Sequence, residues 1–242
     1  SGPARAPRRS GFGPFPVYAG GGFSGSVAGW TGSAWAAVGY LNSMVLTLAV
    51  DSTGTLYAGG SFITNGAELV NRIARWNGVD TLTVVDNSIA DGQVNALVFD
   101  SEDNLYAGGN FTTAGGSPAD YLVRWDGGSW SALGGGVNGP VSALAADRPD
   151  NIYAGGSFTA PAARFARWDG GSWSPLGSGA NSNVYSLLVS RDTGDLYAGG
   201  MFTTAGARDS RYIGWLTGLP TRASSFPWVL ILPVLLHQEG TP

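Results

Sequence analysis

Three aspartates, Asp51, Asp100 and Asp147, recur at matching positions along the sequence and raise the question of a cation site. Carboxylate oxygens are ligands that calcium prefers in proteins. Each aspartate stands singly among turn-forming residues, however, and the sequence has no Asp-x-Asp-x-Asp-Gly loop. We therefore interpret the three residues as turn caps and predict no metal site.

Three arginines, Arg75, Arg124 and Arg167, each directly precede a tryptophan. A planar guanidinium suits a carboxylate or a sugar, so repeated binding pockets are one interpretation of this pattern. Two further copies of the pattern have Gly29 and Gly214 instead, which argues against five equivalent sites. We therefore favour stacking of the arginines, or their pairing with nearby aspartates.

Few residues of the chain suit acid, base or nucleophilic catalysis. The chain contains no Cys and one His, His237, and its glutamates are Glu68, Glu102 and Glu239. Glycoside hydrolysis requires two carboxylates on either side of the scissile bond, and the sequence places no such pair. We predict a protein that is not an enzyme and has no catalytic residues and no cofactor.

A repeat with the signature Tyr-Ala-Gly-Gly underlies all of these positions. Its five copies begin at Tyr18, Tyr57, Tyr106, Tyr153 and Tyr197, which are 39 to 49 residues apart. A period of this size indicates one supersecondary unit stacked on copies of itself. A complete copy has four short β-branched or aromatic runs bounded by Gly, Asn, Asp or Ser, which predict four strands. Four short strands per repeat are typical of a β-propeller blade.

The full pattern, Tyr-Ala-Gly-Gly-x-Phe-Thr-Thr-Ala-Gly followed by Ala-Arg-Trp-Asp-Gly-Gly-Ser-Trp-Ser, resembles the kelch-like propeller repeats of bacterial secreted and surface proteins. The resemblance covers residues 16–218. It implies an all-β fold, a five-bladed β-propeller of four-stranded antiparallel blades, and an extracellular or cell-surface location. Propellers of this kind have varied functions, so the resemblance specifies no single one.

One tryptophan per repeat is predicted to fill the space between neighbouring blades. Glycine pairs inside a strand usually mark a close approach by another group, and we expect these tryptophans to approach the Gly-Gly pairs. The predicted blade-core residues are Trp30, Trp76, Trp125, Trp168 and Trp215.

The first and last repeats each lack one predicted strand. Residues 1–15 are predicted to form an N-terminal arm, 16–218 the five-repeat propeller, 219–225 a linker and 226–242 an apolar tail. The tail sequence Val-Leu-Ile-Leu-Pro-Val matches the first strand of the second repeat, Val-Leu-Thr-Leu-Ala-Val, at four of six positions. We therefore expect the tail to complete a terminal blade of its own chain or of a neighbouring subunit, through Phe226, Trp228, Val229, Leu230, Ile231, Leu232, Val234, Leu235 and Leu236.

The strands missing from the first and last repeats suggest two functions. The first is a structural or interaction propeller that assembles head-to-tail with itself into a fibre or surface assembly by terminal strand exchange. The second is a monomeric propeller, closed by its own tail, that binds an extracellular glycan or protein through its loop face. A net charge of −4 favours no nucleic-acid partner. The apolar run from Phe226 to Leu236 is too short to span a membrane, which takes about 20 residues.

Overall fold

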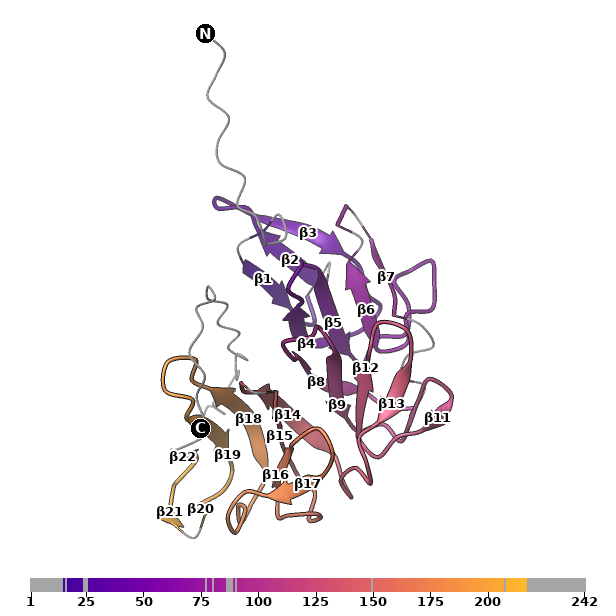
Figure 1. Cartoon of the computed structure of the whole chain (residues 1–242). Helices are drawn as coiled ribbons and strands as arrows, with labels where there is room; N and C mark the ends of the chain where they lie inside the picture. The colour runs from indigo at the N-terminus through magenta and orange to yellow at the C-terminus, as the bar shows by residue number, and fades with distance from the viewer. Residues whose placement is uncertain are drawn as a thin grey trace, which may run out of the picture.

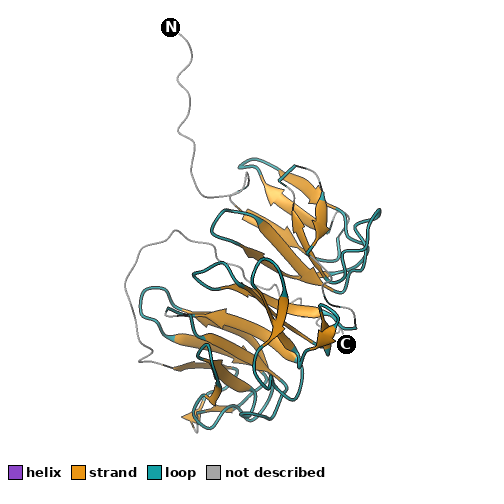
Figure 2. Cartoon of the chain, turned by 45° about the vertical axis from the view of Figure 1, so that its right-hand side comes forward, coloured by secondary structure: helices purple, strands orange, loops and turns teal. Residues whose placement is uncertain are grey.

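The structure is a computed structural model in which residues 15, 17–23, 26–76, 78–79, 81–85, 89, 91–148, 150–206 and 208–216 are described. Within these ranges the chain forms short strands and no helix (Figure 2). The predicted linker and tail lie outside the described residues, as does the predicted arm apart from Phe15.

Five antiparallel sheets follow one another in chain order, because each run of β-branched and aromatic residues returns on itself at a turn rich in Gly, Asn and Asp. The first sheet contains β1 (Val17–Gly20), β2 (Val27–Trp30) and β3 (Trp35–Gly39). The second contains β4 (Val45–Val50), β5 (Leu56–Gly60), β6 (Ile73–Trp76) and β7 (Leu82–Val84). The third contains β8 (Val94–Phe99), β9 (Leu105–Gly109), β12 (Leu122–Trp125) and β13 (Trp130–Ala132). The fourth contains β14 (Val141–Ala146), β15 (Ile152–Gly156), β16 (Phe165–Trp168) and β17 (Trp173–Pro175). The fifth contains β18 (Val184–Val189), β19 (Leu196–Gly200) and β22 (Ile213–Leu216).

The strand pattern expected from the repeats is present in the described residues, including the three-stranded first and fifth sheets. Two small hairpins were not predicted and lie in the loops between the second and third strands of the third and fifth sheets. They are β10 (Thr113–Ala114) with β11 (Ser117–Pro118), and β20 (Thr204–Ala205) with β21 (Arg208–Asp209). Figure 1 shows the five sheets following one another around an arc, with the first and fifth at its two ends.

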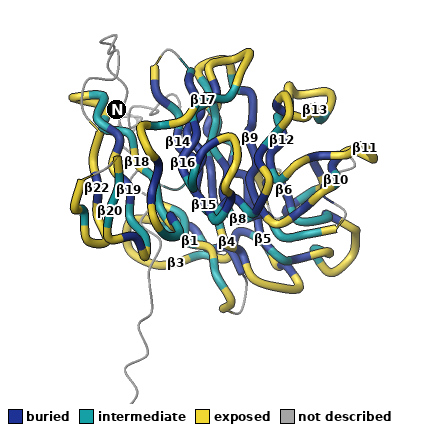
Figure 3. Tube along the Cα trace, turned by 90° about the horizontal axis from the view of Figure 1, so that it is seen from below, coloured by how far each residue is buried: buried dark blue, intermediate teal, exposed yellow. Residues whose placement is uncertain are grey.

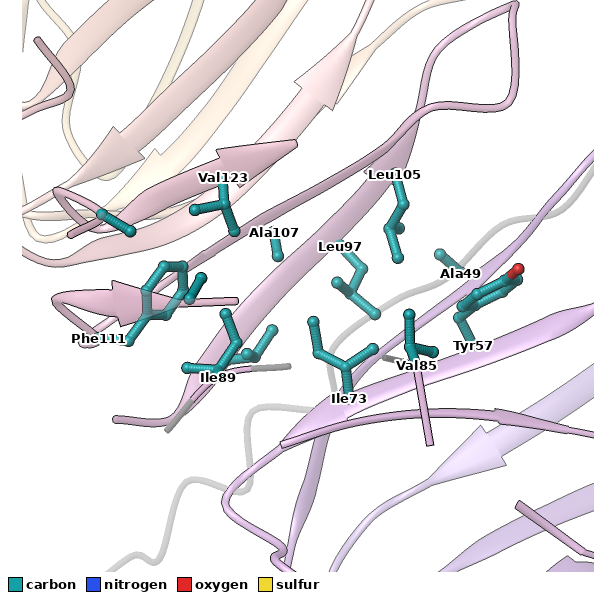
Figure 4. Close-up of a cluster of buried hydrophobic side chains, with 13 residues drawn as sticks. Ala49, Tyr57, Ile73, Val85, Ile89, Leu97, Leu105, Ala107, Phe111 and Val123 are labelled. Carbon is teal, nitrogen blue, oxygen red and sulfur yellow. The ribbon is translucent and has the colours of Figure 1, made fainter. Parts of the chain in front are cut away.

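Four apolar clusters hold consecutive sheets together, one between each sheet and the next. The cluster between the second and third sheets includes Tyr57, Ile73, Leu97 and Leu105 (Figure 4). The other clusters join the first sheet to the second, the third to the fourth and the fourth to the fifth. Each sheet between the two ends therefore buries both of its faces, and stacking neighbours supplies the core that one repeat cannot make alone.

The two glycines of each Tyr-Ala-Gly-Gly copy serve different contacts. A Cβ on the second glycine of the third sheet, Gly109, would collide with the backbone carbonyl of Gln93, which directly precedes the first strand. The first glycine, Gly108, lies under Val141 and Leu144 of the next sheet. The expectation that tryptophans approach the glycine pairs is therefore wrong, because aliphatic side chains of the following sheet fill that space.

The predicted core tryptophans occupy three kinds of environment. Trp76 and Trp168 are buried in the clusters between sheets, and Trp30 and Trp125 are half-buried. Trp76 also contacts Phe15 of the N-terminal segment, with ring centroids 5.9 Å apart. Trp215 does not fill the expected role, because 69% of it is exposed.

The strand register explains the exposure of Trp215. In the fourth sheet Tyr153 pairs with Arg167 and Ile152 with Trp168, whereas in the fifth sheet Tyr197 pairs with Trp215. Trp215 therefore stands at the position of the arginine, and Leu216 takes the position of the tryptophan. The sequence alignment that placed Gly214 at the arginine position is one residue out of register.

Candidate assembly surface

The recurrent aspartates cap turns, as predicted. Asp147 is buried and accepts hydrogen bonds from the backbone N–H of Asn151 at 2.9 Å and from the hydroxyl of Tyr153 at 2.6 Å. Asp100 accepts the corresponding bonds from Asn104 at 2.9 Å and Tyr106 at 3.1 Å. Each carboxylate thus ties the end of the first strand to the start of the second.

Burial raises the pKa of Tyr106 to about 12, and the charge of Asp100 adds to this effect. Burial also raises the pKa of Tyr153, and the hydrogen bond to Asp147 contributes in the same direction. Ionisation would place a second negative charge beside a carboxylate in a poorly solvated site. These tyrosines therefore act as neutral hydrogen-bond donors that hold the turn.

Arg124 joins the same network, because its Nη2 donates to Oδ1 of Asn104 at 2.8 Å. The cavity beside it, of about 300 Å³, is lined by Arg124, Asp100, Glu102 and Asp150, among others. Glu68 lies in a different loop, between the second and third strands of the second sheet. Among the residues that the structure describes, no group of three or more His, Cys, Asp or Glu could hold a metal ion.

Polar clasps join neighbouring sheets at the turns between their first and second strands. Asp150, which has a φ of 72°, accepts hydrogen bonds from the N–H of Ser101 at 2.8 Å and from its hydroxyl at 2.6 Å. Asp103 accepts the same pair of bonds from Ser52. The clasp therefore fastens the second sheet to the third and the third to the fourth.

The outward face of the fifth sheet breaks this pattern. Leu188, Tyr197 and Ile213 are 55%, 40% and 66% exposed, and Figure 3 shows little deep burial along β18, β19 and β22. Their register equivalents in the fourth sheet, Ala145, Tyr153 and Phe165, are at most 7% exposed. We call the apolar surface formed by Leu188, Tyr197, Ile213 and Trp215 the open face.

The polar network behind that face is also altered. Ser190 takes the place of Asp147, and Asp195 takes the place of Asn151. Ser190 Oγ accepts a hydrogen bond from the N–H of Thr193 at 3.2 Å. The fifth sheet therefore differs from the fourth both in what covers it and in how its turn is held.

Two strand edges near the ends of the arc are unpaired within the described part of the chain. β1 is the inner edge of the first sheet, where β4 occupies the corresponding position in the second sheet. β22 is the outer edge of the fifth sheet, where β17 closes the fourth. Val17 on β1 is 50% exposed. The two edges and the open face together form the candidate assembly surface.

The model of the Rax2 C-terminal β-propeller domain family matches residues 29–180, which is more than half of the 242-residue chain. The chain belongs to this β-propeller family. No curated protein matches it significantly.

Solved structures share the propeller fold at low sequence identity. The GH74 enzyme of Niastella koreensis is 17% identical with a TM-score of 0.51, over 86% of this chain and 36% of the enzyme. The extracellular domain described as part of the hybrid two-component system BT4673 of B. thetaiotaomicron is 12% identical with a TM-score of 0.51, over 76% and 24% of the two chains. This propeller chain thus spans about a quarter to a third of the length of these structures, and the likeness concerns the fold alone.

The predicted assembly residues of this Rax2-type propeller chain, from Phe226 to Leu236 in the tail, lie outside the described residues. The open face was missed by the sequence analysis, although Leu188 at an alanine position and Trp215 at an arginine position were signals of it. Among the described residues, no helix has the length and apolar character needed to cross a membrane.

Proposed function

We propose that this chain is a non-enzymatic extracellular propeller of five kelch-like blades that assembles head-to-tail into a fibre or surface assembly through its terminal blades. The observation that carries the proposal is the open face, where the fifth blade exposes an apolar surface that every preceding blade buries against its neighbour. The extracellular location is supported by the resemblance to surface-protein repeats and by the fold shared with an extracellular bacterial domain.

An exposed apolar patch on a soluble protein marks a surface that another group covers. The blade that follows each internal sheet presents its first strand to the face of the preceding one, so the natural cover for the open face is the first blade of a propeller. Within the described residues, the first blade has no such strand. Contact between unlike ends of identical molecules is heterologous, and it grows into a filament unless rotation closes a ring.

Strand exchange supplies the missing element. An unpaired strand edge such as β1 is a template for an added strand. The tail resembles a first strand in sequence, and pairing it with β1 of a neighbouring subunit would restore a four-stranded first blade. The same step would cover the apolar face of the fifth blade of the preceding subunit.

Oligomeric size tests this proposal directly. We expect the full chain to form particles larger than a monomer in multi-angle light scattering and linear arrays in negative-stain electron microscopy. Leu232→Asp in the tail, or deletion of residues 219–242, should return it to a monomer. A monomeric full chain, or an oligomer of unchanged size after either alteration, would contradict the assembly.

A cavity between the third and fourth sheets favours the second function, a monomer that binds an extracellular glycan or protein. It measures about 640 Å³, within the usual range of ligand pockets, and its lining includes Trp168, Trp173, Asp120 and Asn138. Aromatic rings beside carboxylate and amide groups suit a sugar. Saturable binding on a glycan array, lost in Trp173→Ala and kept in the control Trp130→Ala, would support this alternative.

A further inference from the structure

The first glycine of each Tyr-Ala-Gly-Gly copy forms a receptor for two side chains of the next sheet. A Cβ on Gly108 would lie 2.6 Å from Cγ1 of Val141 and 3.3 Å from Cδ1 of Leu144, so only glycine leaves room for both. The same contact recurs between the other sheets, at Gly20 with Val45 and Leu48, at Gly59 with Val94 and Leu97, and at Gly155 with Val184 and Leu187.

The fifth copy has the receptor but no partner for it among the described residues. The atoms nearest to a Cβ on Gly199 are Oγ of Ser186, at 2.6 Å, and the carbonyl of Tyr212, at 3.9 Å. Ser186 lies on β18 of the fifth sheet, and Tyr212 directly precedes its strand β22. Among the described residues, no side chain of another sheet fills the space that Val and Leu fill elsewhere, and this space is continuous with the open face through the neighbouring Tyr197 and Ile213.

The two inserted side chains follow a fixed spacing in the sequence. In each sheet that fills a receptor, the first strand reads Val-x-x-Leu, and both side chains point to the preceding sheet. The residue directly after the valine is instead partly exposed. Leu46 in the second sheet and Tyr185 in the fifth are at least 38% exposed, and Asn95 and Ser142 are half-buried. The C-terminal segment contains the same spacing in Val229-Leu230-Ile231-Leu232.

We propose that Val229 and Leu232 of the C-terminal segment insert over Gly199 of the fifth sheet. This inference rests on the proposed role of the tail as a first strand, and it names the receptor, the two inserted side chains and the register. In this register Val229 occupies over Gly199 the position that Val184 occupies over Gly155, and Leu232 occupies the position of Leu187. Leu230 lies on the side away from the sheet. The inserted strand would cover the apolar side chains around the receptor.

A disulfide pair tests the contact in the full chain, which has no native Cys. At the receptor in the fourth sheet, a Cβ on Gly155 would lie 3.1 Å from Cβ of Val184, close to the separation of roughly 3.5–4.5 Å that a disulfide requires. We expect Gly199→Cys with Val229→Cys to cross-link completely under mild oxidation. The matched control, Gly199→Cys with Leu230→Cys, should stay largely reduced because residue 230 points away.

The outcomes separate this contact from the assembly. Cross-linking in a chain that light scattering finds monomeric would keep the contact and overturn head-to-tail assembly. A folded oligomer in which the pair does not cross-link, or in which the control cross-links equally, would overturn the contact and keep the assembly. Failure to cross-link together with binding of a soluble glycan to the open face, lost in Trp215→Ala, would also overturn the contact.

A second measurement, which needs no new disulfide, tests the same contact if the cysteine variants do not fold. Gly199→Ala and Leu232→Ala should each lower the Tm of the full chain, and the shift of the double variant should fall short of the sum, because both remove one contact. Leu230→Ala combined with Gly199→Ala should give additive shifts. Additive shifts for Leu232→Ala as well would overturn the proposed insertion.

Discussion

The fourth and fifth sheets are built from the same repeat, yet within the described residues the fourth sheet is covered on both faces and the fifth on one. Tyr153 in the fourth sheet is completely buried, whereas its equivalent Tyr197 is 40% exposed. The receptor at Gly155 holds Val184 and Leu187, whereas the one at Gly199 holds no side chain of another described sheet. Whether a side chain of the repeat is buried therefore depends on the sheet that lies next to it and not on the repeat sequence itself.

The comparison also explains why the polar turn differs. A buried tyrosine hydroxyl needs an acceptor, and in the fourth sheet Asp147 supplies it at 2.6 Å. Tyr197 is partly exposed, so water can serve its hydroxyl, and Ser190 stands where the aspartate would be. Loss of cover and loss of the acceptor thus occur together.

The largest expected effect comes from truncating one apolar side chain at equivalent positions of the two sheets. Phe165→Ala should destabilise the chain by about 3–5 kcal/mol, because it leaves a cavity between sheets. Ile213→Ala should cost less than about 1 kcal/mol in a monomeric chain that lacks residues 219–242, because the side chain is then exposed. Chemical denaturation measures both. An equal cost at Ile213 would mean that the open face is covered even without those residues.

Removing the turn acceptor should have the next largest effect. Asp147→Ala leaves buried donors of Asn151 and Tyr153 without their carboxylate partner, which we expect to cost about 3 kcal/mol. Ser190→Ala, the equivalent change in the fifth sheet, should cost about 0.5 kcal/mol. Urea unfolding of the two variants in parallel gives the comparison, and similar losses would show that the two turns are held alike.

Removal of a single hydroxyl should separate the sheets more finely. Tyr153→Phe loses the hydrogen bond to Asp147 and should cost about 1.5 kcal/mol. Tyr197→Phe should change the free energy of unfolding by less than about 0.5 kcal/mol. Thermal unfolding of both variants suffices, and a larger loss for Tyr197→Phe would contradict the comparison.

A loss of stability is also expected at alkaline pH. The pKa of Tyr106 is raised from 10.0 to about 12, so above pH 10 the unfolded chain loses a proton that the folded chain keeps. Stability should therefore be complete below pH 10 and fall as the pH rises towards 12. Tyrosinate absorbance and unfolding curves across this window measure it. In Tyr106→Phe the loss should be smaller, and an unchanged loss would assign it to other groups.

Much of the fold was predictable because the same pattern of residue types recurs five times along the chain. The positions of the strands, the short first and last sheets and the capping role of the aspartates follow from residue types and spacing, since turn chemistry and strand preference are local. The space over the glycine pairs was assigned to the wrong side chains, because Gly108 meets Val141 from a strand more than thirty residues away. The spacing within one repeat does not show which side chain of the next repeat packs over the glycine pair.

The sequence by itself determined the repeat, its strands and the Val-x-x-Leu spacing that recurs in the C-terminal segment. Only the tertiary structure decided that Trp215 stands at the arginine position, that Gly199 has no covering side chain among the described residues, and that the apolar face of the fifth sheet is open. The physical reason is that strands and turns depend on neighbours in the chain, whereas cover depends on which sheet lies against which.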